Sequence, residues 1–167
     1  LSAAARLDLY EYNDQKLSYV VASLNEGGEA YRAQADEYAA QLAGAQSNTI
    51  PRYLVGYYLQ TEQYDKAIDE AILGASYSAS DADTWDDCAA LLNEALFQNM
   101  LTPLLTEERA ALMAKLTEYY DALQAYNASA LVPVELSESA QAFFDKIVIL
   151  NSCMDDDRRF AETLFTA

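Results

Sequence analysis

The chain has 167 residues, of which 27 are acidic and 10 are basic, and its formal net charge is −17 at pH 7. Phosphate backbones and anionic lipid headgroups repel such a chain, so we expect neither nucleic-acid binding nor direct lipid binding. No apolar run approaches the ~20 residues that a membrane span needs, so we expect no direct membrane insertion by this chain. The chain contains no histidine, which excludes a Ser-His-Asp triad, a Cys-His dyad and a histidine-ligated zinc site within it.

The first predicted elements are two helices that form a hairpin over residues 13–43. Asn13 can cap the first helix, which ends at Gly27-Gly28 because glycine accepts the left-handed conformation of a helix C-terminus. The apolar stripe of this helix consists of Leu17, Val20, Val21 and Leu24. The second helix runs from about residue 29 to residue 43, and the residues on one of its faces are Tyr31, Ala35, Tyr38, Ala39 and Leu42.

The stretch from Pro51 to Gly74 predicts a second, tighter hairpin. Leu54 and Tyr58 are four residues apart and share one helix face, and a polar break at residues 60–63 precedes the next helix. The next helix carries a stripe of small residues, namely Ala67, Ala71 and Gly74. Small side chains on one stripe let two helices approach closely, so we expect a tight antiparallel pair.

This stretch resembles the tetratricopeptide repeat, a unit of about 34 residues made of two helices. Five positions match the family pattern, namely Leu54, Tyr58, Tyr64, Ala67 and Gly74. One period after Pro51 the chain has Trp85, and the pattern has tryptophan at that place. The positions that depart from the pattern are Val55, Ala71 and Ala79, where the family has glycine, an aromatic residue and a closing proline. The best repeat covers residues 49–82.

A further helix is predicted from Asp81 to about Gln98. Ser80 can cap it, and Asp83 three residues later can act as the acid of a capping box. The residues expected on its inward face are Trp85, Cys88, Ala89, Leu92 and Leu96. This helix begins a second repeat, after which the repeat pattern fades.

The rest of the chain predicts degenerate capping helices over residues 103–165. The expected boundaries are a turn at Met100-Leu101, a helix from Thr102 to about Tyr126, a linker that contains Pro133, a helix opened by Ser137 and a last helix from Asp155. Three acidic residues at the start of the last helix suit the helix dipole and need no further role.

The sequence as a whole predicts an all-α protein, since no run shows the strict alternation of a strand bounded by turn residues. We expect one domain over residues 1–167 with about seven or eight helices. The tetratricopeptide resemblance implies that its antiparallel hairpins stack as a right-handed superhelix.

Candidate catalytic and metal sites are weak in this sequence. Residues 81–87 look like a calcium loop but fail its D-x-[DN]-x-[DN]-G pattern, because Trp85 and Asp86 occupy the fifth and sixth positions. Cys88 lies in a helical pattern as a small apolar residue, and spacing leaves open whether it pairs with Cys153. We therefore predict no enzymatic activity, no cofactor and no metal.

The tetratricopeptide resemblance also implies a concave groove, lined by the first helix of each hairpin. In the first hairpin the implied positions are Thr49, Arg52, Gly56, Leu59 and Gln60. In the next hairpin they are Asp83, Asp86, Ala90, Asn93 and Glu94. The second set is acidic, so we expect a protein or peptide partner with lysine, arginine or an N-terminal amine, bound weakly and in a salt-sensitive way. Tyr53 and Tyr57 lie off the packing stripe and either pack between hairpins or contact a ligand.

The start of the chain carries a second resemblance. Residues 4–8 resemble the last turn of a tetratricopeptide helix, and the segment from Ala4 to Tyr19 resembles the soluble tail of bacterial membrane proteins of surface-polysaccharide assembly, of the O-antigen ligase or polymerase type. The resemblance implies a non-catalytic interaction or scaffold module of a larger membrane-associated protein. It also implies a membrane-spanning region upstream of Leu1. The side of the membrane on which this module lies stays open.

Two other functions stay open. One is an acidic cell-surface domain that binds or hydrolyses carbohydrate, which requires aromatic side chains and carboxylates that converge in a pocket. The other is a structural spacer, for which charge reversal at Asp86 and Glu94 would leave every function of the parent protein intact.

Overall fold

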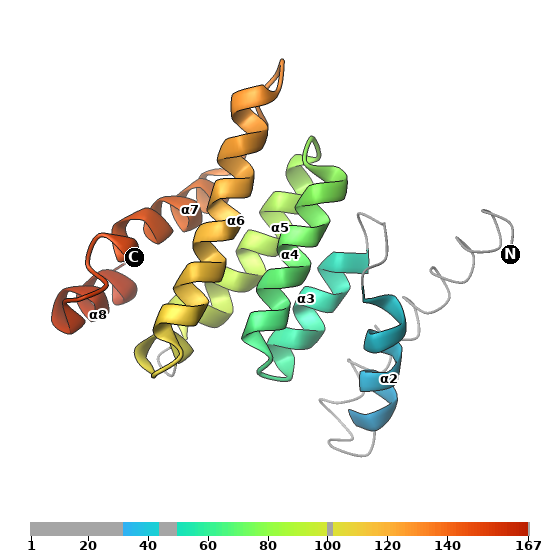
Figure 1. Cartoon of the computed structure of the whole chain (residues 1–167), viewed down its shortest axis with the longest axis horizontal. Coiled ribbons are helices and arrows are strands. Elements are labelled where there is room, and N and C mark those ends of the chain that lie inside the picture. The colour runs from blue at the N-terminus through green and yellow to red at the C-terminus, as the bar shows by residue number, and fades with distance from the viewer. Residues whose placement is uncertain (1–31, 44–49, 100–101, 167) are drawn as a thin grey trace, which may run out of the picture.

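The described part of the protein is entirely helical (Figure 1). A computed structural model describes residues 32–43, 50–99 and 102–166. Its elements are α2 (Arg32–Leu42), α3 (Ile50–Gln60), α4 (Tyr64–Ser78), α5 (Ala82–Asn93), the π-helical turn η2 (Glu94–Gln98), the 3-10 turn η3 (Pro103–Leu105), α6 (Arg109–Ser129), α7 (Glu138–Asn151) and α8 (Asp157–Phe165). These ranges contain seven α-helices and no strand, which confirms the predicted all-α class. The predicted helix after Asn13 lies outside the described residues.

The helices form an elongated row in which each helix packs against one or more helices close to it in sequence. In Figure 1, α3 to α6 run side by side, with α2 at one end of the row and α7 and α8 at the other. Helix α3 packs against α4, and α5 packs against both of them. Helix α6 packs on α4, α7 on α5 and α6, and α8 on α7. The core therefore runs along the row instead of surrounding one central helix.

The hairpin of α3 and α4 is held at close range by small residues, as the sequence predicts. Ala67, Ala71 and Gly74 are buried on α4. A Cβ atom added at Gly74 would lie 3.0 Å from the Cβ atom of Pro51, closer than nearly all real contacts of this kind. The two helices could not approach this closely with a larger residue at position 74.

Several predicted helix boundaries need correction. Asp81 caps α5, because its carboxylate accepts the N–H of Asp83 at 3.1 Å, whereas the sequence analysis assigned the cap to Ser80. The helix predicted from Thr102 is divided into η3 and α6. The Thr102 hydroxyl donates to the carbonyl of Leu96, which turns the chain at this point. Ser137 caps α7 as predicted, by accepting the N–H of Ala140 at 3.2 Å.

Two more boundaries shift by a few residues. Helix α6 continues to Ser129, three residues past the predicted end at Tyr126. Helix α8 begins at Asp157, because the carboxylate of Asp156 accepts the N–H of Arg159 at 3.0 Å and takes the capping position. The sequence analysis placed this start at Asp155.

A cluster of five aromatic rings joins α5, η2, α6 and α7. Trp85 stacks on Tyr119 with ring centroids 5.3 Å apart, and Phe144 contacts both rings at 6.1 and 5.1 Å. Phe143 extends the cluster from Phe144 to Phe97. All five side chains are at most 3% exposed. The indole N–H of Trp85 donates to the carbonyl of Ala79 at 2.8 Å, so the ring's polar atom is satisfied despite its burial.

Both cysteines are buried free thiols, which answers the open question about pairing. Cys88 is fully buried in the core, as the sequence predicts. Burial raises the pKa of its thiol to about 12, and the nearby Arg52 opposes that shift. In the described ranges, no helix is both long enough and apolar enough to cross a bilayer.

Truncation of the central ring should be severely destabilising. We expect Trp85→Ala to lower the free energy of unfolding by about 3–5 kcal/mol, because it removes a large buried ring and its hydrogen bond. Tyr77 is 45% exposed, so Tyr77→Ala should change stability by less than about 0.5 kcal/mol. Urea unfolding of both variants checks this. Equal losses would show that Trp85 does not occupy the core.

The buried thiol of Cys88 should make stability fall at alkaline pH. An exposed thiol in the unfolded chain ionises from its reference pKa of 9.0, whereas folded Cys88 stays protonated to about 12. The contribution is therefore complete below pH 9 and is lost as pH rises through this window. We expect the stability difference between the wild type and Cys88→Ala to shrink by about 1 kcal/mol between pH 7 and pH 10. A constant difference in urea unfolding at the two pH values would contradict this.

Candidate functional site

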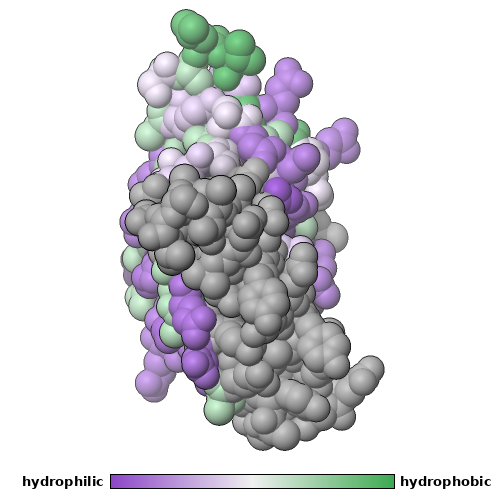
Figure 2. Space-filling view, turned by 90° about the vertical axis from the view of Figure 1, so that its right-hand side faces the viewer, coloured by the Kyte–Doolittle hydropathy of each residue, from purple (hydrophilic) through white to green (hydrophobic). Residues whose placement is uncertain are grey.

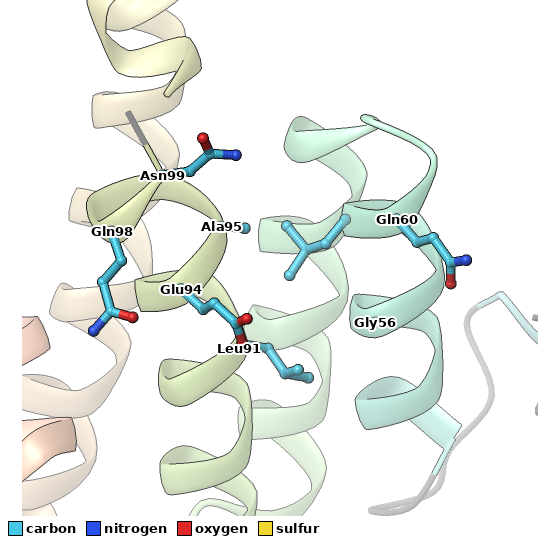
Figure 3. A pocket seen from close by; sticks show the side chains of 8 residues that line it. Gly56, Gln60, Leu91, Glu94, Ala95, Gln98 and Asn99 are labelled. Atoms are coloured by element: carbon cyan, nitrogen blue, oxygen red, sulfur yellow. The ribbon is translucent and has the colours of Figure 1, made fainter. Parts of the chain in front are cut away.

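A groove runs along α3 where that helix faces α5 and η2 (Figure 3). Its wider part has a volume of about 720 Å³ and is lined by Gly56, Leu59, Gln60, Leu91, Glu94, Ala95, Gln98 and Asn99. A second hollow of about 530 Å³ is lined by Arg52, Tyr53, Asp87, Ala90 and Leu91. Leu91 lines both, so we treat these residues as one surface and name it the α3–α5 groove.

Helix α3 supplies the side of the groove that the sequence analysis assigned to it. Of the positions implied by the tetratricopeptide resemblance, Arg52, Gly56, Leu59 and Gln60 line the groove. Thr49 lies outside the described residues. These side chains meet because they recur at intervals of three and four residues, which places them on one face of the helix. Their role in binding stays a prediction.

The residues of α5 and η2 that face the groove are only partly those that the tetratricopeptide resemblance implies. Ala90 and Glu94 line it, but Asp86 points elsewhere, since its carboxylate accepts the N–H of Ser137 at 3.1 and 3.3 Å. Asn93 lines a separate groove beside α7. Asp83 is exposed in the first turn of α5 and lines neither surface. The groove is thus lined by six of the implied residues and not by Asp83, Asp86 or Asn93; the six are Arg52, Gly56, Leu59, Gln60, Ala90 and Glu94.

The charge of the α3–α5 groove is less acidic than the sequence analysis expects. Arg52 pairs with Asp87 at 2.5 Å, with the side chains 28% and 52% exposed. A pair this exposed contributes only ~0–1 kcal/mol to stability. Glu94 is an exposed carboxylate. The lining residues include one positive and two negative side chains, a net charge of −1, whereas the implied positions include Arg52 and three acidic residues, a net charge of −2.

The lining of the groove combines amide and apolar side chains. The lining includes three side-chain amides, those of Gln60, Gln98 and Asn99, and an amide group can both donate and accept a hydrogen bond. The apolar lining side chains are Leu59, Leu91, Ala95, Ala90 and Tyr53. The lining residues include no serine, cysteine or histidine. Amides beside apolar side chains suit an extended chain, whose backbone needs both donors and acceptors.

Gly56 leaves the middle of α3 without a side chain at the groove. Nothing lies within 4 Å of a Cβ atom added there. Figure 3 shows Gly56 and Gln60 on α3, with Leu91, Glu94 and Ala95 on the helix across the groove. Glycine inside a helix costs roughly 0.5–1 kcal/mol relative to alanine. Unlike Gly74, Gly56 is therefore not required by the packing of the fold.

The two tyrosines that the sequence left open have different environments. Tyr57 is 1% exposed, and its hydroxyl donates to Asp36 on α2. It therefore packs between α2 and α3. Tyr53 is 42% exposed at the groove, where it is available for contact with a ligand.

A second groove lies between α7, α8 and η2, and the sequence analysis missed it. Its volume is about 860 Å³, and its apolar lining residues are Phe97, Ala142, Phe143, Ile149, Leu164 and Phe165. We name this surface the α7–α8 groove. Lys146 lies in its wall and donates to the carbonyls of Leu164 and Thr166 at 3.1 and 2.6 Å. Partial burial lowers the pKa of this lysine.

The α7–α8 groove has a weak signal in the sequence. Val148 and Ile149 are 45% and 49% exposed, although they belong to the continuous apolar run of residues 147–150 on α7. Only one face of a helix can be buried by a single neighbouring layer. The excess of apolar residues in this run was therefore the available indication of a further surface.

Comparison with protein-family models, curated proteins and solved structures finds no match for this chain. Across the part of the chain that the structure describes, no group of three or more cysteine, aspartate or glutamate side chains is placed to hold a metal ion.

The two helical glycines should respond in opposite ways to alanine. We expect Gly56→Ala to raise the free energy of unfolding by roughly 0.5–1 kcal/mol, because helix propensity improves and the added methyl group meets only open space. Gly74→Ala should lower it by about 1 kcal/mol, since crowding against Pro51 outweighs that gain. Urea unfolding of the pair measures both. A loss of stability in Gly56→Ala would show that the space beside Gly56 is already filled.

Proposed function

We propose that this chain is a non-catalytic protein-interaction module whose α3–α5 groove binds an extended peptide segment. The segment carries a lysine or arginine near an apolar residue. The observation that carries the proposal is Gly56, which keeps the groove floor open at a position where alanine would make a better helix. A residue that costs stability without a packing reason is expected where another molecule approaches the backbone.

The packing order supports a tetratricopeptide-like array with a right-handed superhelical stack. Helices α3 and α4 form one hairpin, α5 packs on both, and α6 repeats the packing on α4. Trp85, one repeat period after Pro51, is buried as a repeat residue would be. Helices α7 and α8 would then close one end of the array as degenerate capping helices. Residues 1–167 would form a single domain of this kind.

The chemistry of the lining supports a basic, partly apolar partner. Glu94 offers an exposed carboxylate in the wider part of the groove, and Asp87 lines the second hollow in its pair with Arg52. Between them, Leu59 and Leu91 can cover an apolar side chain. A scaffold role in a larger bacterial membrane-associated protein is consistent with such a module.

The carbohydrate alternative has less support from the groove. Tyr53 is the aromatic side chain among the lining residues, and the neighbouring Asp87 is held by Arg52. A hydrolytic or sugar-binding pocket needs aromatic rings and available carboxylates that converge, which these residues do not provide. We therefore prefer a peptide ligand to a glycan.

The test is selection from a displayed library of random peptides, followed by affinity measurements with the selected peptides. We expect Gly56→Leu to weaken binding by at least about tenfold, because its side chain fills the groove. Gly56→Ala adds only a methyl group and should weaken binding by a smaller factor, whereas Tyr77→Leu, at an exposed residue outside the groove, is the control and should stay within about twofold of the wild type. Undiminished binding by Gly56→Leu, or selection of no peptide above background, would contradict the proposal.

A second test of the peptide-binding proposal reverses a charge in the α3–α5 groove. Glu94→Lys should weaken binding by up to about tenfold and flatten its salt dependence, because it replaces an attraction to the basic residue with repulsion. Glu107 is exposed and lies outside the groove, so Glu107→Lys controls for the change in net charge. Equal effects of the two substitutions would indicate long-range charge and not a contact in the groove.

A further inference from the structure

The two parts of the α3–α5 groove differ in charge. Among the residues that line the wider part, Glu94 is the only charged one, so no basic lining residue offsets its exposed carboxylate. In the second hollow, by contrast, the charged residues Arg52 and Asp87 are paired with each other. The wider part therefore favours a cationic side chain of a partner, and the second hollow does not select for either sign of charge.

The second hollow is suited to an apolar side chain. Its uncharged lining residues are Tyr53, Ala90 and Leu91. Tyr53 is 42% exposed, and its ring offers a large and rigid apolar face. An apolar side chain in this hollow would contact Tyr53 on α3 together with Ala90 and Leu91 on α5. Because Leu91 also lines the wider part, the two parts are neighbours along the groove.

Helices α3 and α5 run in the same direction along this groove. Arg52 of α3 contacts Asp87 of α5 in the second hollow. The wider part is lined by later residues of both helices, including Gly56 and Glu94 (Figure 3). Distance along the groove can therefore be measured along either helix.

The separation of the two parts follows from helix geometry. On α5 the second hollow is lined within residues 87–91, whose middle lies five residues before Glu94. An α-helix rises about 1.5 Å per residue, so the separation along the groove is roughly 7–8 Å. A partner that uses both parts must place its basic and its apolar side chain about this far apart.

An extended peptide meets this requirement at one spacing. Its backbone rises about 3.3 Å per residue, and successive side chains point to opposite faces. Side chains two residues apart share a face and are separated by about 6.6 Å along the chain. Adjacent side chains, and side chains three residues apart, point to opposite faces, so both cannot enter the groove.

We propose that the α3–α5 groove selects an extended segment in which an apolar residue lies two positions from a lysine or arginine. The basic side chain lies beside Glu94, the apolar side chain fills the second hollow, and the residue between them faces solvent. The second hollow lies on one side of Glu94, so the apolar residue also lies on one side of the basic residue. This inference rests on the proposed peptide-binding function and adds the spacing of its two contacts.

A second apolar surface of the protein has to be controlled for in the test. Leu131 and Val132, in the connection between α6 and α7, have relative exposures of 103% and 77%. Figure 2 shows hydrophobic residues gathered at the top of the molecule, the end at which Figure 1 places this connection. Exposed apolar side chains can retain apolar peptides without selecting a spacing. A variant with serine at both positions removes this contribution.

The experiment is selection by the full chain from a displayed library of short peptides, in which a central lysine is fixed and every other position is random. Sequencing measures the enrichment of apolar residues at each position. We expect at least about threefold enrichment at the second position on one side of the lysine, and less than about 1.5-fold at the first and third positions. The Leu131→Ser, Val132→Ser variant should give the same pattern.

Affinity measurements with one selected peptide then assign the apolar contact. Ala90→Leu fills the second hollow, so it should weaken binding by at least about fivefold. The same substitution should change the affinity by less than about twofold when the apolar residue of the peptide is replaced by alanine. Ala110→Leu, at an exposed alanine outside the groove, is the matched control and should bind like the wild type.

The basic contact is assigned in the same way. Glu94→Gln should weaken binding of the selected peptide by about threefold, because it removes the charge and keeps the shape of the side chain. The effect should disappear when the lysine of the peptide is replaced by norleucine, which keeps the stem without the charge. Circular dichroism confirms that each variant is folded.

The outcomes separate the spacing from the peptide-binding function. Apolar enrichment at another spacing or at none, in binding that Gly56→Leu still weakens, would overturn the spacing and leave the function standing. Equal weakening of both peptides by Ala90→Leu would also overturn the spacing. Selection of no peptide above background would overturn both. So would loss of binding in the Leu131→Ser, Val132→Ser variant, which would place the peptide at the connection between α6 and α7.

Discussion

The packing of Trp85 face-on against Tyr119 and edge-on against Phe144 is the contact on which the arrangement of the helices depends. These three rings come from α5, α6 and α7, and they meet in a row whose helices otherwise contact mainly their near neighbours. The hydrogen bond from the indole to the Ala79 carbonyl fixes the ring at the start of α5. Large flat rings that interlock permit few relative positions of the helices that carry them.

The same stack determines which face of α5 is left for the groove. With Trp85, Cys88 and Leu92 committed to the core, the stripe of residues 87, 91 and 94 turns toward α3. The absence of a side chain at Gly56 then leaves space on the side of α3 that faces α5. The α3–α5 groove is thus a consequence of the core packing of α5 and of the missing side chain at Gly56 on α3.

Sequence patterns predicted the parts of this structure that local rules control. The periodicity of residues 51–74, the small stripe on α4 and the cap at Ser137 all follow from nearest-neighbour chemistry. The residues of α5 that face the groove were not predicted correctly, because the expected positions were transferred from the pattern of the tetratricopeptide repeat. Asp86 instead anchors the start of α7, a contact across 51 positions of sequence. The π-helical turn at residues 94–98 and the α7–α8 groove also depend on tertiary packing, which periodicity in one segment cannot report.

The most direct test of this account uses the single tryptophan of the chain. Urea unfolding is followed at once by Trp85 fluorescence and by the helical circular dichroism signal. If the aromatic stack joins α5, α6 and α7, native emission is blue-shifted relative to tryptophan in water, and the two signals change in a single coincident transition. An indole that becomes exposed well before the helices melt would show that the row is held together by other contacts.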